Sequence, residues 1–284
     1  MTPDATREII PPTPVGSGFT RRGGGGLVES VLLGLALLGF ALFLLPLAGL
    51  ILRAPLGRLP ELLVTPAVVQ ATRLSILTSL ASLLLSCVVG VPLAWLFARK
   101  DFPGKGLMRA LAVLPMVLPP VVGGVALLLA FGRRGMLGRP LDEYFGITLP
   151  FTTSGAVLAA TFVAMPFLVI TVEAGLRQAD RRLEDAAATL GASRFTVYRR
   201  ITLPQIAPAL GAGMALCWAR ALGEFGATIT FAGNFPGRTQ TMPLAVYLLL
   251  ESDAEAAYAL SLLLLVISVA VLVALRGRYL GARS

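Results

Sequence analysis

The chain has 284 residues, of which 56% are hydrophobic and 14% are charged, and its mean hydropathy is +0.82. These values exclude a soluble globular domain of this length and place the chain in a membrane. The formal net charge of +9 does not indicate binding to nucleic acid, because the sequence contains no basic soluble module to carry such a site.

The first 26 residues are rich in Pro and Gly, with the stretches PPTP and RRGGGG. Such a composition predicts a disordered tail on the cytoplasmic side. A cleaved signal peptide is the alternative. It is disfavoured because the apolar run that starts at Val31 is longer than a signal core and no small-x-small cleavage site is present. Residues 27–284 are therefore expected to form one transmembrane domain.

Six uncharged runs follow, each near or above the ~20 residues that a helix needs to cross the hydrocarbon core. Backbone in lipid must satisfy its own hydrogen bonds, and no alternating ten-residue pattern of a barrel appears. The sequence therefore predicts an all-α integral membrane protein with six transmembrane helices. The runs are residues 31–52, 74–98, 110–132, 144–172, 201–219 and 256–275.

The distribution of Lys and Arg predicts the orientation of these spans. With the N-terminus inside, 16 of the 24 basic residues lie in cytoplasmic segments and 6 lie in outer loops. This bias favours both termini in the cytoplasm of a multi-pass protein. Anionic lipid at the inner surface is then the natural partner of the positive charge.

The third run carries three prolines and a glycine pair, Pro115, Pro119, Pro120, Gly123 and Gly124. This cluster predicts a kinked or broken helix. Transporters tolerate broken helices where the backbone lines a cavity, so a place on a translocation path is expected. A kink that serves only packing is the alternative.

Residues 184–204 read EDAAATLGASRFTVYRRITLP and form a polar segment between two apolar runs. Residues 183–190 favour a helix, Gly191 suits the left-handed turn that ends one, and Ser193 suits the N-cap of the next. Pro204 is expected to end that second helix before the fifth span. The segment is thus predicted to be two short helices at an angle, projecting into the cytoplasm.

This segment resembles the "EAA" loop of ABC-importer permeases, with Asp185 where that family usually has Glu and Glu184 directly before it. The resemblance implies a coupling loop, residues 177–205, that docks on a separate ATPase subunit. Acidic residues 184 and 185 are expected to meet basic groups there; an ordinary amphipathic loop is the alternative. The implied coupling residues are Glu184, Asp185, Ala186, Ala187, Gly191, Ile201, Leu203 and Pro204.

The fifth span is expected to continue as one helix from about residue 206 to 232, with Arg220 and Glu224 on one face near mid-membrane. Ionisable groups at that depth usually face a bundle interior or a wet path. The alternative is an ion pair that only locks packing. The predicted path and gate residues are Arg220, Glu224, Thr228, Pro119 and Pro120.

Residues 221–234 and 236–247 resemble the molybdate branch of the oxyanion permeases, as do residues 74–99 and 114–138. The likeness covers roughly residues 65–275. It implies a type I ABC-importer permease that brings an oxyanion, molybdate foremost, across the inner membrane as a homodimer. It also implies two copies of an ATPase that binds ATP and Mg²⁺, and an extracytoplasmic oxyanion-binding protein.

Three alternatives to a molybdate permease remain open. A sulfate or thiosulfate permease shares much of the pattern. An ion-coupled secondary transporter would have no reason to keep the coupling loop. A structural scaffold would not need charges within the fifth span.

Catalysis by this chain alone is not expected. The sequence has no His, so no Ser/His or Cys/His pair is available, and it has no phosphate loop of the form G-x-x-x-x-G-K-[ST]. Cys87 and Cys217 lie in apolar runs and do not suggest a metal site. No cofactor is expected to bind to this chain itself.

Overall fold

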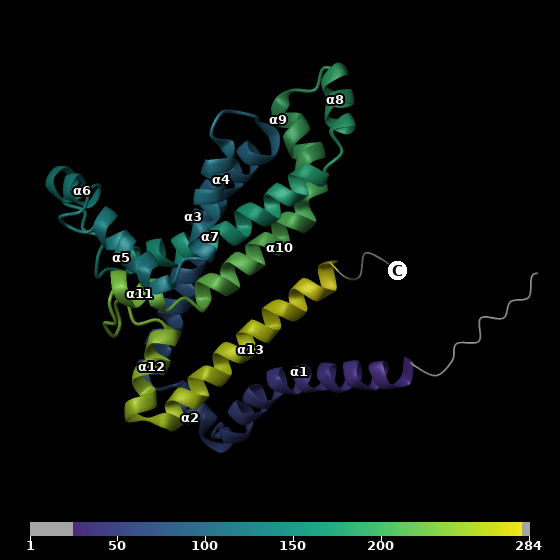
Figure 1. Ribbon diagram of the computed structural model, residues 1–284. Helices are drawn as coiled ribbons and strands as arrows, with labels where there is room; N and C mark the ends of the chain where they lie inside the picture. Colours follow the sequence, from purple (N-terminus) through teal and green to yellow (C-terminus); the bar gives the residue numbers. More distant parts are fainter. Residues whose placement is uncertain (1–24, 280–284) are drawn as a thin grey trace, which may run out of the picture. The chain divides into compact units, whose positions relative to one another are not determined.

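The computed structural model describes residues 25–279, and every regular element in that range is helical (Figure 1). The described part of the chain divides into two units on either side of residue 50. The predicted tail at residues 1–26 lies outside the described range except for Gly25 and Gly26, where the first helix begins.

The first unit contains most of helix α1 (Gly25–Arg53), which continues to the start of the second unit. This helix is apolar on every side over the predicted first span, as expected of a helix in a membrane. Pro46 lies inside it.

Three long helices form the centre of the second unit: α3 (Pro66–Arg99), α7 (Thr153–Gln178) and α10 (Leu203–Leu222). Small residues allow their backbones to approach closely, as is common between helices in membranes. A Cβ atom added to Gly175 of α7 would lie 2.4 Å from the Cβ atom of Ala209 of α10. One added to Gly90 of α3 would lie 3.1 Å from the Met165 side chain of α7.

A stripe of buried hydroxyl groups on α3 ties the other helices to it. The Thr161 hydroxyl of α7 donates to Ser82 Oγ at 3.2 Å, and Trp218 Nε1 of α10 donates to Ser79 Oγ at 3.0 Å. The backbone N–H of Met242 donates to Ser75 Oγ at 2.6 Å. These bonds satisfy polar groups that would otherwise be unpaired in an apolar core.

The third span is broken, as the proline cluster predicted. Helix α4 (Lys105–Val113) and the 3-10 turn η2 (Leu114–Met116) meet α5 (Pro120–Phe131) at an angle of 118°. Five described helices are long and apolar enough to cross a membrane, and this bent pair makes a sixth candidate span. The prediction of six spans is confirmed on that basis.

The fourth span starts later than the apolar run suggested. Residues 144 and 145 end α6 (Gly138–Phe145), and a loop separates α6 from α7. Gly146 takes the left-handed conformation that ends α6, with φ of 65°, and the Thr152 hydroxyl caps α7 by accepting from Gly155 N–H at 3.1 Å. Hydropathy alone does not predict where α6 ends and α7 begins, because it does not depend on backbone conformation or on capping hydrogen bonds.

The expected single helix over residues 206–232 is wrong. Helix α10 ends at Leu222, and a separate short helix, α11, spans Gly226–Phe231. Glu224 lies in the break between the two helices, and its Oε1 atom accepts from the N–H of Ala227 in the first turn of α11 at 2.8 Å.

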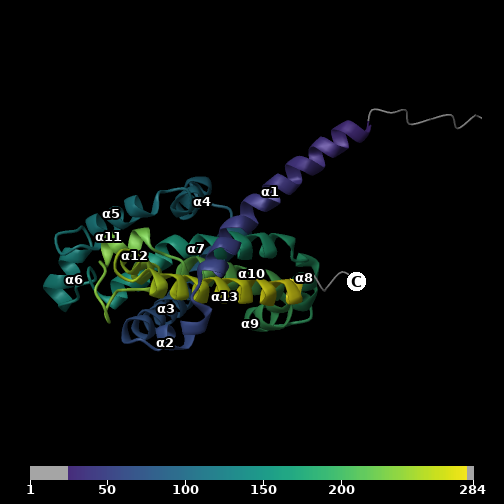
Figure 2. The same cartoon turned by 90° about the horizontal axis from the view of Figure 1, so that it is seen from below.

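The remaining elements complete the second unit. The turn η1 (Leu56–Arg58) and α2 (Leu59–Leu63) precede α3, and α12 (Met242–Ser252) and α13 (Ala254–Tyr279) follow α11. Arg58 pairs with Glu255, which joins the start of this unit to α13. Helices α8 and α9 lie at one end of α7 and α10, whereas α5, α6 and α11 lie at the other end in both views (Figures 1 and 2).

Candidate functional site

The coupling loop is built by caps that its own residues provide. Asp180 Oδ1 caps α8 (Arg181–Thr189) by accepting from Arg182 N–H at 2.9 Å. Gly191 adopts φ of 83°, and its N–H donates to the Ala188 carbonyl at 3.0 Å. Ser193 then caps α9 (Arg194–Val197) by accepting from Thr196 N–H at 3.2 Å. The roles predicted for Gly191 and Ser193 are thus seen in the structure.

The second helix of the loop does not end at Pro204, so that prediction is wrong. Helix α9 passes into a π-helical turn, η3 (Tyr198–Thr202), and then into α10, giving one continuous helix over Arg194–Leu222. Pro204 lies in the first turn of α10, where it has no N–H to donate to the carbonyl of Arg200. The widened π turn directly before it accommodates the proline ring.

Glu184 points into the protein and is not free to meet a partner. Its Oε1 atom lies 2.6 Å from Arg99 Nη2 of α3 and accepts from the Thr202 hydroxyl at 2.9 Å. The side chain therefore fastens α8 to α3 and to the start of α10. Of the two acidic residues expected to face outward, only Asp185 is exposed.

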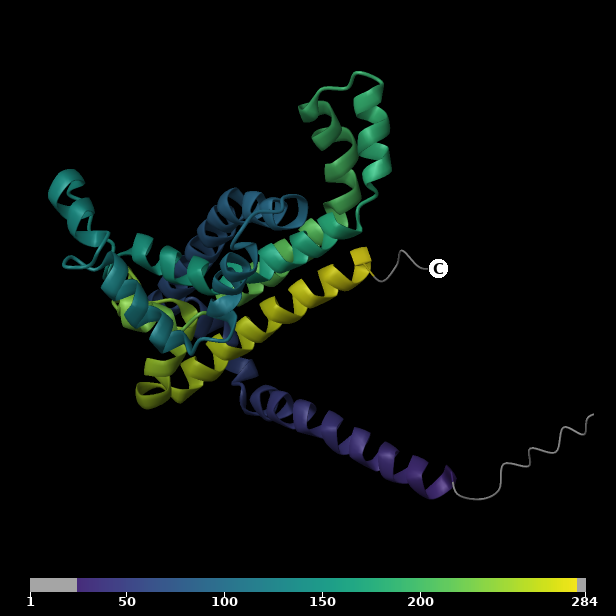
Figure 3. The same ribbon diagram turned by 45° about the horizontal axis from the view of Figure 1, so that its top comes forward.

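The outward surface of the loop is also apolar. Leu190 is 88% exposed, Phe195 is 70% exposed and Leu183 is 53% exposed, although the loop is polar in sequence. Large exposed apolar side chains on a short projection are typical of a docking surface. Figure 3 shows this projection as the green segment at its top, standing away from the other helices.

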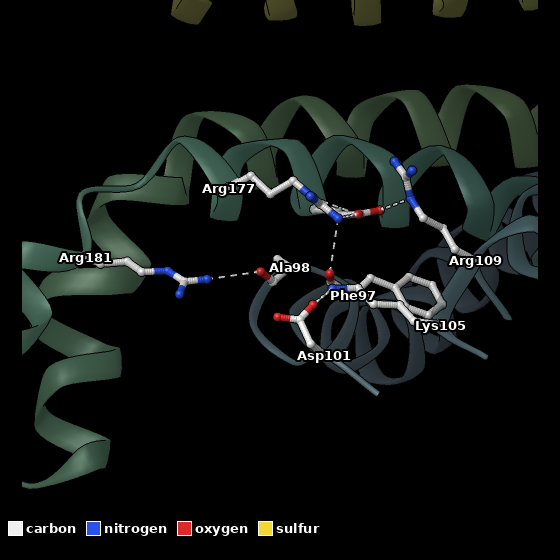
Figure 4. Close-up of polar contacts among 8 residues, drawn as sticks. Phe97, Ala98, Asp101, Lys105, Arg109, Arg177 and Arg181 are labelled. Atoms are coloured by element: carbon white, nitrogen blue, oxygen red, sulfur yellow. Dashed lines mark hydrogen bonds and ion pairs between the residues drawn. The ribbon is translucent and has the colours of Figure 1, made fainter. Parts of the chain in front are cut away.

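A second ionic cluster lies near the coupling loop, and the sequence did not predict it (Figure 4). Glu173 of α7 is buried, and its two carboxylate oxygens accept from Arg109 Nε of α4 and Arg177 Nε of α7, each at 2.9 Å. Arg177 also donates to the Phe97 carbonyl of α3 at 3.3 Å, and Arg181 donates to that of Ala98 at 3.3 Å. The i, i+4 spacing of Glu173 and Arg177, just after the predicted fourth span, is the only signal in the sequence.

This cluster fixes the first half of the broken span to α7 and α3. In the turn between α3 and α4, Lys105 donates to Asp101 at 2.8 Å. That hydrogen bond, together with the positive charge of Lys105, holds the pKa of Asp101 below its usual value.

At the other end of α10, two distant segments that carry predicted path residues come together. A Cβ atom added to Gly226 would lie 2.7 Å from Pro120 Cβ, so the starts of α11 and α5 are in direct contact. One added to Gly124 would lie 2.6 Å from Thr230 Cβ and 3.0 Å from the Ala227 carbonyl oxygen. Helices α5 and α11 therefore pack so closely that there is no room for a side chain at Gly124 or Gly226.

The predicted ion pair lies at this crossing. Arg220 Nη1 is 2.6 Å from Glu224 Oε2, although Glu224 is in the break and not on the face of a helix. The contact is ionic and not an aligned hydrogen bond, because Oε2 has no hydrogen-bond partner in the described part of the chain. The Glu224 side chain is 1% exposed and that of Arg220 is 28% exposed, while Thr228 is buried in α11.

The residues predicted for coupling and those predicted for the path form two separate groups, joined by α10. With 20 residues at 1.5 Å each, α10 is about 30 Å long, close to the thickness of the hydrocarbon core. The fastened coupling loop is at its start, and the Arg220–Glu224 pair is at its end. A displacement of one end can reach the other through a single rigid element.

The tight crossing of α5 and α11 gives a first prediction. Gly124→Ala is expected to lower the stability of the protein by about 1–3 kcal/mol, because the new methyl group would overlap Thr230 and Ala227. A lower midpoint of thermal unfolding in detergent would show this. Gly106→Ala in α4 is the control, since no atom lies within 4 Å of its added Cβ. An unchanged midpoint for Gly124→Ala would contradict the close approach.

The chain is similar to transport permeases of known function. The molybdenum transport system permease of Mycobacterium tuberculosis is 46% identical over 221 residues, which is 78% of this chain and 83% of the relative. That of Escherichia coli K12 is 48% identical over 183 residues, or 64% and 80%. The sulfate transport system permease CysT of Salmonella typhimurium is 36% identical over 213 residues, or 74% and 76%.

Solved structures share the fold. A bacterial ABC transporter involved in the import of the acidic polysaccharide alginate superposes with a TM-score of 0.71 at 18% identity, covering 89% of this chain and 94% of that chain. Residues 90–283 match the family described as binding-protein-dependent transport system inner membrane components. These residues include the coupling loop, the broken third span and the Arg220–Glu224 pair, and this chain belongs to that family.

Proposed function

We propose that this chain is the membrane-spanning permease subunit of an ATP-driven importer and that its substrate is molybdate. The main support is the 46–48% identity to molybdenum permeases over most of the chain, against 36% and 42% for two sulfate permeases. Sulfate is the second candidate, because its permeases are similar over a comparable length.

The coupling loop supports a division of labour between subunits. Its exposed Leu190, Phe195 and Asp185 offer an apolar and acidic surface to a cytoplasmic ATPase, which binds ATP and Mg²⁺ in place of this chain. Two such ATPases act on a homodimer of this chain in the inner membrane, and an extracytoplasmic binding protein delivers the anion. This chain is then a transport subunit and not itself an enzyme.

The same geometry suggests how ATP drives transport. Closure of the ATPase pair moves the coupling loop, and Glu184 passes that movement to α3 and α10 because it binds Arg99 and Thr202. Helix α10 carries the movement to the Arg220–Glu224 pair, beside the contact between Pro120 and Gly226. The broken helices then change their packing as rigid bodies, which gives alternating access.

Transport assays test this function. The chain, its ATPase and its binding protein are reconstituted in vesicles with internal Mg²⁺–ATP, and uptake of labelled molybdate is measured against competing tungstate and sulfate. We expect uptake that needs ATP and is inhibited far more by tungstate than by sulfate. Equal inhibition by sulfate would favour the sulfate candidate, and uptake driven by an ion gradient without ATP would refute the proposal.

The orientation gives a second prediction. In a variant that lacks Cys87 and Cys217, a Cys at Ser193 should react with an impermeant thiol reagent only from the cytoplasmic side, and one at Pro236 only from outside. Both positions are exposed, so access to the reagent is limited only by the membrane. The result follows from the 16-to-6 distribution of basic residues. The reverse labelling pattern would show that the termini are outside.

A further inference from the structure

A cavity of about 640 Å³ lies at the end of the second unit that is opposite to the coupling loop. The end of α5, the loop after α6, the start of α7 and the loop after α11 all line it. Two arginines from segments more than a hundred residues apart, Arg133 and Arg238, meet at this cavity together with Phe151 and Thr152. It is called the Arg133–Arg238 pocket.

The backbone at the pocket is strained. Phe151 has φ of 60°, a left-handed conformation that is an outlier for a bulky residue, and it is the only non-glycine residue with positive φ in the described range. Its N–H donates to the Phe231 carbonyl at 3.3 Å, and its ring meets that of Phe235 edge-on, with centroids 6.2 Å apart. Strain of this kind persists where the surroundings hold it, often at functional sites.

The strained turn presents two aromatic rings to the surroundings instead of burying them. Phe151 and Phe235 are each 49% exposed, although they contact each other. The Thr153 hydroxyl donates to the Arg238 carbonyl at 2.8 Å and so ties the two loops together. The result is a prebuilt surface with exposed aromatic rings beside two guanidinium groups, a composition enriched at the centres of protein interfaces.

The polar groups of the pocket favour a protein carboxylate over a free anion. The Thr148 hydroxyl donates to Asp142, and that of Thr152 donates to the Leu149 carbonyl, so neither is left to bind an anion. Arg133 is 72% exposed and lies 3.9 Å from Asp142. Two hydrated arginines in a cavity this large would hold a small tetrahedral anion poorly, whereas a carboxylate borne on a protein loop gains apolar contact with the rings.

We infer that the Arg133–Arg238 pocket receives an acidic side chain of the extracytoplasmic binding protein and is the anchor of that complex. This inference rests on the proposed function, which supplies the partner and places this end outside. The anchor has a consequence for gating. The pocket is bounded by Gly132, which follows α5, and Phe151 is bonded to Phe231, the last residue of α11. A docked carboxylate therefore holds the outer ends of the two helices that cross at Gly124.

The test uses the whole permease–ATPase complex in lipid nanodiscs and the molybdate-loaded binding protein as the probe. The double variant Arg133→Gln/Arg238→Gln is expected to raise the concentration of binding protein that half-maximally stimulates ATP hydrolysis by roughly tenfold. Arg134→Gln is the matched control, because Arg134 is exposed beside Arg133 and does not line the pocket. It should change this concentration by less than about twofold.

The variant Phe151→Gly tests the contribution of the aromatic contact to binding separately from that of the two arginines. Glycine adopts the same backbone conformation without strain, so the fold is retained while the apolar contact is lost. We expect it to weaken binding as well, with the salt dependence of binding unchanged, whereas the arginine variant should reduce that dependence.

Three outcomes would overturn the inference. If Arg134→Gln raises the half-maximal concentration as much as the double variant does, the arginines act only by long-range electrostatic attraction and the pocket is not a docking site. If sodium molybdate alone binds to the complex and the double variant loses this binding, the pocket is a site for the free anion. Unchanged stimulation in the double variant would remove the pocket from docking. If the wild-type complex imports no molybdate at all, the proposed function has failed instead.

Discussion

Gly191→Pro is expected to reduce ATP-driven uptake to background while leaving the protein inserted in the membrane. Gly191 has φ of 83°, which proline cannot adopt, and proline also lacks the N–H that donates to Ala188. The turn between α8 and α9 is then lost, and with it the arrangement of Leu190, Phe195 and Asp185. Uptake in vesicles and copurification of the ATPase from detergent measure the two effects.

Gly191→Asn is the matched control for this variant. Asn tolerates the left-handed conformation better than other residues, and a side chain at this position meets no atom within 4 Å. This variant should keep most of the uptake and of the bound ATPase. If Gly191→Pro retains both ATPase and transport, the loop is not the coupling element.

Glu224→Gln is expected to lower uptake at least roughly tenfold. It keeps an oxygen that accepts from the Ala227 N–H, so α11 still begins at the same place. It removes the charge that Arg220 faces at 2.6 Å, and the loss of one partner of a buried pair typically costs ~3–5 kcal/mol. Arg220→Met, which leaves Glu224 charged and buried, is expected to be worse, since Glu224 is less exposed than Arg220.

The double variant Arg220→Met/Glu224→Gln separates a gate from a packing contact. It removes both charges and keeps the cap on α11, so the amount of assembled complex should return towards that of the wild type. Uptake of labelled molybdate, normalised to assembled complex, should stay low if the pair takes part in gating. Normal uptake by the double variant would leave the pair only a role in packing.

Features that depend on composition and on neighbouring residues could be predicted from the amino-acid sequence. Long uncharged runs located the spans, because without the alternating pattern of a barrel such a run satisfies its backbone hydrogen bonds in lipid only as a helix. The prolines of residues 115–120 predicted the break in the third span, and Gly191 and Ser193 predicted the turn of the coupling loop, because their conformational preferences act within a few residues.

Two predictions were wrong because interactions with neighbouring groups outweighed the usual preference of a single residue. The helix over residues 206–232 breaks where the Glu224 carboxylate accepts from a backbone N–H of the next helix, and the helix through Pro204 continues because a π turn makes room for the ring. Both outcomes oppose the usual preference of the residue, since a Glu that is four residues from an Arg favours a continuous helix and a Pro favours an end.

The contacts between residues that are distant in sequence could not be predicted and are known from the packed structure. Pro120 touches Gly226, Glu184 turns inward to Arg99, and Glu173 gathers two arginines from different helices. Hydropathy cannot report these contacts, because it is the same whichever way a helix faces. The partner of a buried charge, and the backbone that packs closely against a glycine, depend on how the helices pack together.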